Sequence, residues 1–185
     1  MTILPREFYS KDTVTVAKNL LGKKIVRKIG KNEISGIITE TEAYRHTDDP
    51  ASHAFRRITA RNKVMFEEVG LAYVYFTYGM YFCFNVVAKT PKTAAGAVLI
   101  RAIEPVKGIK IMQRNRGNIN QKNLTNGPAK LAQALDISKK QYGIDLTKNS
   151  ELYISEGIGR KKITSSPRIG ITEAVDKLWN FKIKI

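Results

Sequence analysis

Strand-like patterns dominate the chain, and helical spacing of apolar residues is confined to short stretches. Apolar residues recur at helical spacing over Lys11–Leu21, which predicts a short helix that ends at Gly22. Lys23–Ile29 and Glu33–Tyr44 are instead rich in β-branched residues. The turn residues Gly30-Lys31-Asn32 join them, and the whole stretch therefore predicts a β-hairpin.

A second hairpin is predicted over Leu71–Ala88, with Tyr78-Gly79-Met80 at its tip, and an apolar strand over Ala95–Ile103 follows it. The remaining predicted elements are short: helical turns in Arg61–Glu68, helices at Lys107–Arg114 and Ala129–Leu135, and strands at Glu151–Ser155 and Ile169–Thr172. Because the strands come in runs with helices between and around them, we expect an α+β fold with a mostly antiparallel sheet. Residues 1–185 are expected to form one compact domain from which the second hairpin protrudes.

The composition narrows the class of protein. The chain has 185 residues, of which 43% are hydrophobic and 26% are charged, an ordinary balance for a globular domain. No apolar run reaches the ~18 residues needed to span a bilayer, and the N-terminus lacks the pattern of a signal peptide. The single cysteine, Cys83, excludes an internal disulfide and multi-cysteine metal sites, and we interpret it as a packing residue of an apolar strand.

The charge of the chain is the first indication of function. Lys and Arg number 32 against 16 Asp and Glu, which gives a formal net charge of +16. A domain this basic repels itself unless it binds an anion, and nucleic acid is the commonest such partner. A solvated lysine-rich surface is the alternative interpretation of the charge.

Aromatic residues are concentrated in the second hairpin, where seven of the 16 lie between Tyr73 and Phe84. A hydrophobic core is one interpretation of this cluster. Several of its members are tyrosines, however, and a buried tyrosine needs a hydrogen-bond partner. Tyr78 lies at the predicted turn, where an exposed ring on a basic protein suits stacking on bases or wedging between them.

Two acidic side chains and a phenol share one face of a predicted strand, because Glu40, Glu42 and Tyr44 are spaced by two. Carboxylates are repelled by polyanions, so one interpretation is a general base or an electrostatic stabiliser. The other is an edge-strand ion pair with a nearby Lys or Arg. Arg101 has two similar interpretations, as an ion-pair partner of Glu104 or as a residue of a pocket.

The polar segment after this strand contains His46, Asp48, Asp49 and His53. Its spacing matches no standard zinc pattern and no cysteine accompanies it, so we expect no metal site. A histidine in such a loop is more often a hydrogen-bonding or stacking residue. The basic segment Arg56–Asn62, which follows it, suits contacts with phosphates.

Six segments then follow one another in a recognisable order: Ile38–Tyr44, His53, Arg61-Asn62-x-x-Met65-Phe66, Tyr73–Asn85, Val98–Pro105 and Gly127–Leu131. In this order they resemble the alkyladenine (3-methyladenine) DNA glycosylase family, and the likeness covers about residues 13–171. The resemblance implies an enzyme that flips and excises alkylated or deaminated purines from duplex DNA. It also implies a curved antiparallel sheet flanked by helices, and no metal or cofactor.

The resemblance implies roles for individual residues. Glu42 corresponds to the general base that activates the attacking water, and Arg101 to a residue that supports it. A base pocket is implied, formed by Tyr44, His53, Tyr75, Asn85 and Leu99, with a further wall at residues 168–171. Tyr78 corresponds to the residue that fills the gap left by the flipped nucleotide. DNA contacts are implied for Arg57, Thr59, Arg61, Met80, Tyr81 and Lys130.

The segments 38–53 and 73–85 contain no lysine that could form a Schiff base, which predicts a monofunctional enzyme that leaves an abasic site in base excision repair. Its expected partner is double-stranded DNA containing damaged purines, with no membrane and no obligate protein partner. We expect a monomer in the cytoplasm, associated with the nucleoid if the source is prokaryotic. The alternative is a non-catalytic module for nucleic acid, RNA for example, whose tyrosines stack on bases and which has no need of Glu42.

Overall fold

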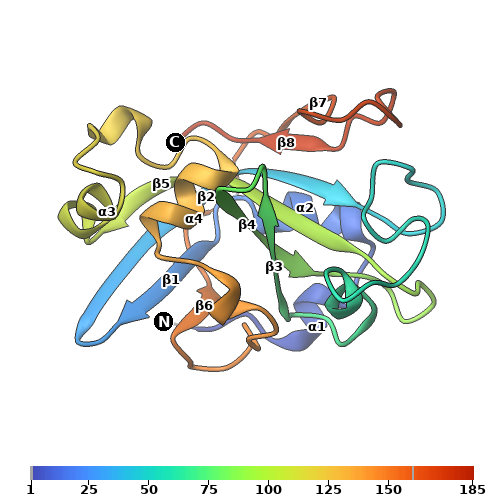
Figure 1. Cartoon of the computed structure of the whole chain (residues 1–185), viewed down its shortest axis with the longest axis horizontal. Helices are drawn as coiled ribbons and strands as arrows, with labels where there is room; N and C mark the ends of the chain where they lie inside the picture. Colours follow the sequence, from blue (N-terminus) through green and yellow to red (C-terminus); the bar gives the residue numbers. More distant parts are fainter. Residues whose placement is uncertain (1, 160) are drawn as a thin grey trace.

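The computed structural model describes residues 2–159 and 161–185. An antiparallel sheet forms its centre, with strands in the order β3-β4-β5-β2-β1-β6 and with β8 and then β7 added beside β2. The strands are β1 (Lys24–Ile29), β2 (Asn32–Tyr44), β3 (Ala72–Thr77), β4 (Tyr81–Val87), β5 (Ala97–Lys107), β6 (Leu152–Ser155), β7 (Thr164–Ser166) and β8 (Asn180–Lys182). The sheet curls, and helices cover both of its faces (Figure 1). The predicted α+β fold is confirmed.

The long strand β2 lies between neighbours on both edges. One edge pairs with β5 from Ser35 to Tyr44, and the other pairs first with β1 and then, over Glu40–Glu42, with β8. The pairing of β2 with β5 is irregular between Ile38 and Thr41, where the register shifts twice. Such bulges bend a strand and re-aim its side chains, and they are common next to active sites.

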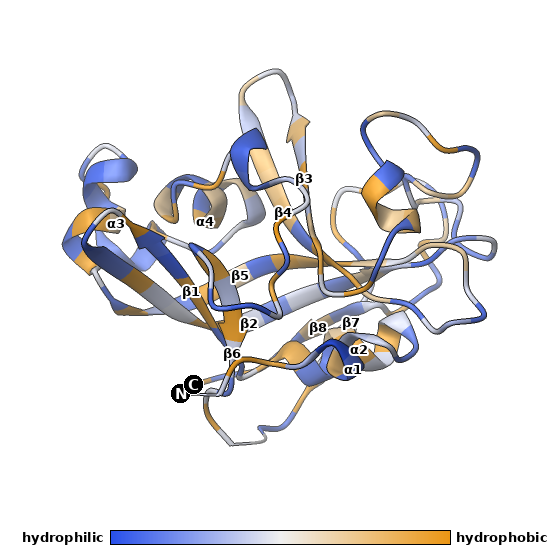
Figure 2. Cartoon of the chain, turned by 90° about the horizontal axis from the view of Figure 1, so that it is seen from below, coloured by the Kyte–Doolittle hydropathy of each residue, from blue (hydrophilic) through white to orange (hydrophobic). Residues whose placement is uncertain are grey.

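The helices are α1 (Arg6–Tyr9), α2 (Thr13–Leu20), α3 (Ile109–Asn115) and α4 (Pro128–Ala134), with 3₁₀ turns at Lys63–Phe66, Gln121–Asn123 and Lys139–Gln141. α2 begins where the Asp12 carboxylate accepts hydrogen bonds from the N–H groups of Val14 and Thr15. α4 begins at Pro128, a residue suited to a first helical turn. α2 packs on β2 and β5 and α4 on β4 and β5, on opposite faces of the sheet (Figures 1 and 2).

Two groups of buried apolar side chains hold these layers together. The larger lies between the sheet and the helices and includes Val16, Leu20, Ile38, Phe84 and Leu131. The smaller lies between the loop after β2 and the base of the hairpin, and it includes Ala54, Val64, Met65, Tyr73 and Val87. The second group fixes the loop that carries His53 against β3.

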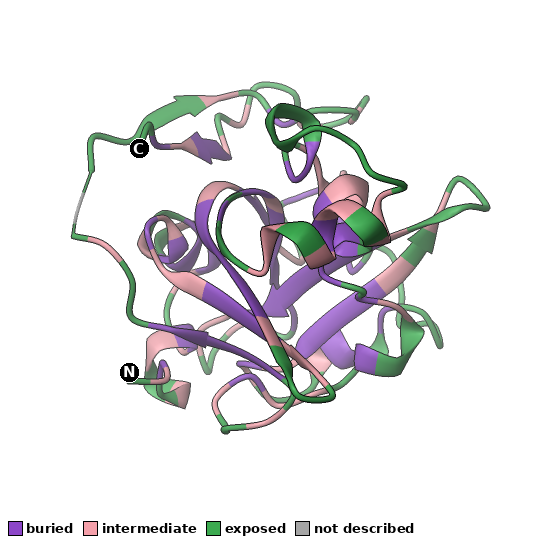
Figure 3. Cartoon of the chain, turned by 90° about the vertical axis from the view of Figure 1, so that its left-hand side faces the viewer, coloured by how far each residue is buried: buried purple, intermediate pink, exposed green. Residues whose placement is uncertain are grey.

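The hairpin β3–β4 protrudes from the body of the molecule, as predicted (Figures 2 and 3). Thr77 pairs with Tyr81, and the residues between them form the tip. Tyr78 and Gly79 have φ of 51° and 66°. Glycine adopts this left-handed backbone readily, whereas a bulky side chain does so rarely. Tyr78 is 85% exposed, so the structure excludes a core position for this ring.

Near the C-terminus the predicted strand Ile169–Thr172 is wrong. The segment forms a turn at Gly170, whose φ is +78°. The N–H of Ile169 donates to a side chain rather than to a neighbouring strand. The pattern gave no sign of β7 or β8, both three residues long.

Strand β5 also differs from its prediction, because it continues to Lys107 and moves the start of α3 to Ile109. It passes through Pro105, which lacks an N–H but pairs with Gly36 beside a bulge, where a proline is tolerated.

Candidate active site

The carboxylate of Glu42 is fully buried and accepts four hydrogen bonds. Its Oε1 accepts from the N–H of Ile169 at 2.8 Å and from Nδ2 of Asn180 at 2.9 Å. Its Oε2 accepts from the Tyr44 hydroxyl at 2.9 Å and from Nη1 of Arg101 at 3.3 Å. A buried carboxylate needs such partners to offset the loss of water. Burial and the adjacent Glu42 raise the pKa of Tyr44, so that its hydroxyl stays protonated and donates.

Arg101 joins this carboxylate to a second one. Its Nε donates to Oε1 of Glu40 at 2.9 Å, and the same oxygen accepts from Nδ2 of Asn180 at 2.8 Å. Glu40 and Glu42 thus contact the same two side chains from one face of β2, as their spacing in the sequence predicted. Arg101 is an ion-pair partner and a pocket residue at once. It does not pair with Glu104, which lies three residues along the strand and so points to the opposite face.

A cavity of about 260 Å³ opens in front of this network. It contains every residue predicted for the base pocket, namely Tyr44, His53, Tyr75, Asn85 and Leu99, and the predicted wall at Ile169, Gly170 and Ile171 also lines it. Glu42 does not line the cavity. It lies directly behind three residues that do: Tyr44, Arg101 and Ile169.

His53 is held by two tyrosines of β3. Its Nδ1 lies 2.8 Å from the Tyr73 hydroxyl, and its ring meets that of Tyr75 edge-on at 4.7 Å. Burial, together with the charge of Arg61, lowers the pKa of His53 to about 4. The imidazole is therefore neutral at physiological pH, and it puts no positive charge into the cavity.

Asn85 is a polar residue in an apolar strand, and it has both a structural hydrogen bond and a place in the cavity wall. Its Nδ2 donates to the backbone oxygen of Tyr73 at 3.0 Å, a bond that satisfies a buried amide. The side chain also lines the cavity, where Leu99 lies opposite it in the pairing of β4 with β5. Cys83, predicted to be a packing residue of an apolar strand, is buried in β4 and also lines the same cavity.

The site thus combines an aromatic cavity with a buried carboxylate that is bound to an arginine, and comparison with known proteins shows which family has this chain as a member. The family model for methylpurine-DNA glycosylase matches residues 7–185. The chain belongs to this family.

Relatives from several organisms cover nearly all of the chain. A protein of Carboxydothermus hydrogenoformans is 49% identical over 184 residues, which is 98% of this chain and 95% of that protein. A protein of Prosthecochloris aestuarii is 48% identical over 94% of this chain and 84% of its own, and one of Methanocella arvoryzae is 43% identical over 98% and 92%. Each carries the name "Putative 3-methyladenine DNA glycosylase". The chain is thus a DNA glycosylase, and its substrate is DNA.

The outer surface of the glycosylase carries the residues predicted to contact DNA. At the hairpin tip Met80 is 66% exposed and Tyr81 39% exposed, beside Tyr78. On α4 the ammonium of Lys130 donates to Oδ1 of Asn126 at 2.8 Å.

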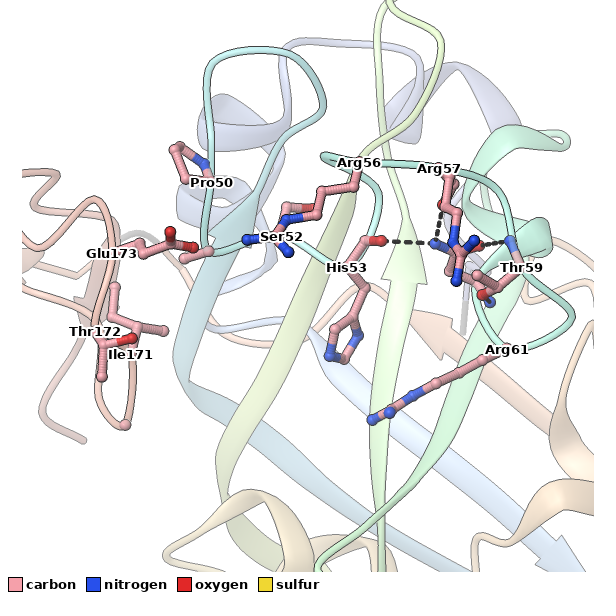
Figure 4. A pocket seen from close by; sticks show the side chains of 13 residues that line it. Pro50, Ser52, His53, Arg56, Arg57, Thr59, Arg61, Ile171, Thr172 and Glu173 are labelled. Carbon is pink, nitrogen blue, oxygen red and sulfur yellow. Dashed lines mark hydrogen bonds between the residues drawn. The ribbon is translucent and has the colours of Figure 1, made fainter.

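A second depression, of about 460 Å³, adjoins the cavity, and Arg57 and Thr59 line it opposite residues 171–173 (Figure 4). Arg61 lines both spaces, with its guanidinium 4.7 Å from the centroid of the Tyr75 ring. Arg61 therefore faces the pocket.

The polar loop of the glycosylase does not gather metal ligands. His46, Asp48, Asp49 and His53 each contact a different partner: Phe66, Arg45, Arg168 and Tyr73, respectively. Within residues 2–159 and 161–185, no group of three or more His, Cys, Asp or Glu side chains could hold a metal ion. No helix in these ranges is long and apolar enough to cross a membrane.

Sequence reasoning missed several residues of the site. Asn180 binds both acidic side chains, and Tyr73 orients His53. The predicted wall at residues 168–171 included Arg168, but not its pairing with Asp49 in the interior. The aromatic cluster contained Tyr73, but no local pattern indicated Asn180 or the partner of Arg168, because these partners lie more than 100 residues apart in the chain.

Proposed function

We propose that this glycosylase is monofunctional and excises alkylated or deaminated purines, such as 3-methyladenine and hypoxanthine, from duplex DNA in base excision repair. The observation that carries the proposal is the buried Glu42, linked to Arg101 and lying directly behind a cavity lined by aromatic rings. A base in a duplex is out of reach of such a site, so the nucleotide must be flipped into the cavity.

The cavity supplies what a damaged purine would need. Stacking on an aromatic side chain contributes about 1–3 kcal/mol per base. A cationic alkylated ring gains further from the π face of Tyr44 or Tyr75. Because His53 is neutral, it does not oppose such a cation. Asn85 would lie against the edge of the purine that carries guanine's amino group, so that normal guanine meets a clash.

The proposed chemistry is a displacement at the sugar. The oxygen of water bonds to C1′, the bond from C1′ to the base breaks with its electron pair leaving on the base, and Glu42 takes the proton from water. The carboxylate also stabilises the positive charge that builds up on the sugar. Tyr44, Arg101 and Ile169 line the cavity and contact the buried Glu42, so the attacking water would reach the carboxylate next to these residues.

The product would be an abasic site with an intact strand. A lyase step requires an amine nucleophile, and the described residues that line the cavity include no lysine. Tyr78 would fill the space left in the duplex, and Arg57, Thr59, Arg61, Met80, Tyr81 and Lys130 would bind the DNA around it. The protein would act as a monomer without an obligate protein partner.

Release of free base tests the proposal. Duplexes that carry hypoxanthine, 7-methylguanine or only normal bases are incubated with the protein, and strands are then analysed with and without alkali. We expect base release from both damaged duplexes and breaks only after alkali. Binding without release from any duplex would instead favour the alternative, a non-catalytic nucleic-acid-binding module. Breaks before alkali would contradict a monofunctional reaction.

A further inference from the structure

A buried ion pair lies next to the proposed active site but takes no part in the proposed reaction. Arg168 and Asp49 have fully buried side chains and form a two-pronged contact, with Nη2 2.6 Å from Oδ1 and Nη1 2.7 Å from Oδ2. The loop carrying Asp49 is held in turn, because the N–H of Arg45 donates to the same carboxylate at 2.9 Å.

Arg168 supports Tyr44 from behind. Its guanidinium lies 4.6 Å from the centroid of the Tyr44 ring and 5.2 Å from that of Trp179. Tyr44 lines the cavity whereas Arg168 does not, so the arginine lies on the side of the ring away from the cavity. A base stacked on Tyr44 would therefore rest on a ring that a fixed cation holds in place.

The same arginine is tied to two backbone groups next to Glu42. Its Nη1 donates to the oxygen of Ala43, the residue between Glu42 and Tyr44, at 2.9 Å. The residue after it, Ile169, donates its N–H to Glu42 at 2.8 Å. One side chain thus sets both the stacking platform and the carboxylate.

Stability alone does not explain this pair. A buried ion pair is often no more stabilising than apolar side chains of the same shape. Within the described residues, Nε of Arg168 also has no hydrogen-bond partner, and a buried donor left unpaired is costly. The flat, forked guanidinium is nevertheless suited to stack on a ring and bind a carboxylate at once, which lysine cannot do.

We infer that Arg168, held by Asp49, is a positioning residue for the proposed base excision, one that sets Tyr44 and Glu42 relative to each other. The inference rests on the proposed function. It adds that the rate depends on how residues outside the cavity hold Tyr44 and Glu42 in place. A displacement of about 1 Å at a reacting group can reduce a rate about 100-fold.

The test uses a double variant, Asp49→Asn with Arg168→Met. It removes both charges together, keeps an oxygen to accept from the N–H of Arg45, and leaves a long side chain next to the rings of Tyr44 and Trp179. Arg168→Lys retains the charge but loses the fork. The matched control is Arg27→Met, because Arg27 is also a nearly buried arginine, paired with Glu151, and has no contact with the site.

Three measurements are compared at a temperature at which circular dichroism shows every variant folded. They are the single-turnover rate of hypoxanthine release, the affinity for undamaged duplex, and hydrogen exchange at the amide of Ile169. For the double variant we expect a rate lower by about 100-fold, unchanged affinity for undamaged duplex and loss of protection at Ile169. Arg168→Lys should resemble the double variant, whereas Arg27→Met should lower only the melting temperature.

A double variant that keeps the wild-type rate, or a control that loses as much rate, would overturn the inference. Failure of the proposed function has a different signature. Wild-type protein would then release no base, while the exchange of the Ile169 amide would still show whether Arg168 positions the donor to Glu42. Protection that survives in the double variant would contradict the positioning role in either case.

Discussion

Replacing Glu42 by glutamine changes only the charge and the donor pattern of the proposed general base. The carboxylate accepts from four donors, two at each oxygen. A glutamine can keep its oxygen toward Ile169 and Asn180 and turn its amide group toward Tyr44, whose hydroxyl can rotate to accept. Arg101 then loses its acceptor on this side chain. The opposite orientation of the amide would instead leave the N–H of Ile169 and Nδ2 of Asn180 facing another donor.

The cost in stability follows from this count. One lost hydrogen bond to a charged group costs about 1.5–3 kcal/mol. For a chain of this size each kcal/mol lowers the melting temperature by about 2–4 °C, so a fall of roughly 3–12 °C is expected for Glu42→Gln. Since domains are stable by about 5–15 kcal/mol, the variant remains folded under assay conditions. Loss of a general base should reduce the rate about 10²–10⁴-fold, far more than partial unfolding could.

The assay is single-turnover release of hypoxanthine from a duplex with enzyme in excess, read as alkali-labile sites, together with affinity for the same duplex. The Glu42→Gln protein should bind the damaged duplex as the wild type does but release hypoxanthine far more slowly. Glu40→Gln is the matched control, because it removes a carboxylate from the same strand face that shares Arg101 and Asn180. A Glu42→Gln protein that releases base at close to the wild-type rate would refute the reasoning, and so would an equal loss in Glu40→Gln.

The remaining predictions concern the insertion of Tyr78 into the duplex, the selectivity of Asn85, the salt dependence of DNA binding and the pKa of His53. Tyr78→Ala should retain the chemistry but reduce the unstacking of a 2-aminopurine next to the lesion, and an unchanged reporter would contradict the wedge. Asn85→Ala should lose about 1 kcal/mol of stability and gain release of normal guanine; lower stability with the parental ratio of guanine to hypoxanthine release would leave it a structural amide. Affinity for undamaged duplex should fall steeply with salt, as counterions are released from phosphates, whereas a flat dependence would contradict a DNA-binding basic surface. The folded-state pKa of His53 lies below its ordinary value of 6.5, so the unfolded chain takes up the proton first and this contribution to stability is lost as the pH falls from about 6.5 toward 4. An NMR titration of the ring should have its midpoint near 4, and a midpoint near 6.5 would be incompatible with this environment.

Short-range pattern was enough to predict much of the site. The spacing of Glu40, Glu42 and Tyr44 placed them on one face because side chains alternate along a strand. The hairpin and its tip followed from turn residues between two aromatic strands. The partners of these groups could not be predicted in this way. Asn180 reaches Glu42 only because β8 docks on the edge of β2 that β1 leaves free, a contact across 138 residues.

The error at Ile169–Thr172 has a related cause. The segment alternates in polarity like a strand, but its residues 169–171 line a cavity instead of pairing with a neighbour. An alternating pattern of hydrophobicity predicts that a segment has one exposed and one buried side. It does not predict whether a neighbouring strand or a cavity lies against the buried side.

The left-handed backbone at Tyr78 means that the hairpin is not built for its own stability. A side chain with a Cβ costs about 1–2 kcal/mol in that conformation, and glycine at the same place would avoid the cost. A hairpin optimised for folding alone would carry glycine there. Under the proposed role of Tyr78 in the duplex, the requirement for an aromatic ring at the tip and the requirement for a stable hairpin act in opposite directions on this one residue.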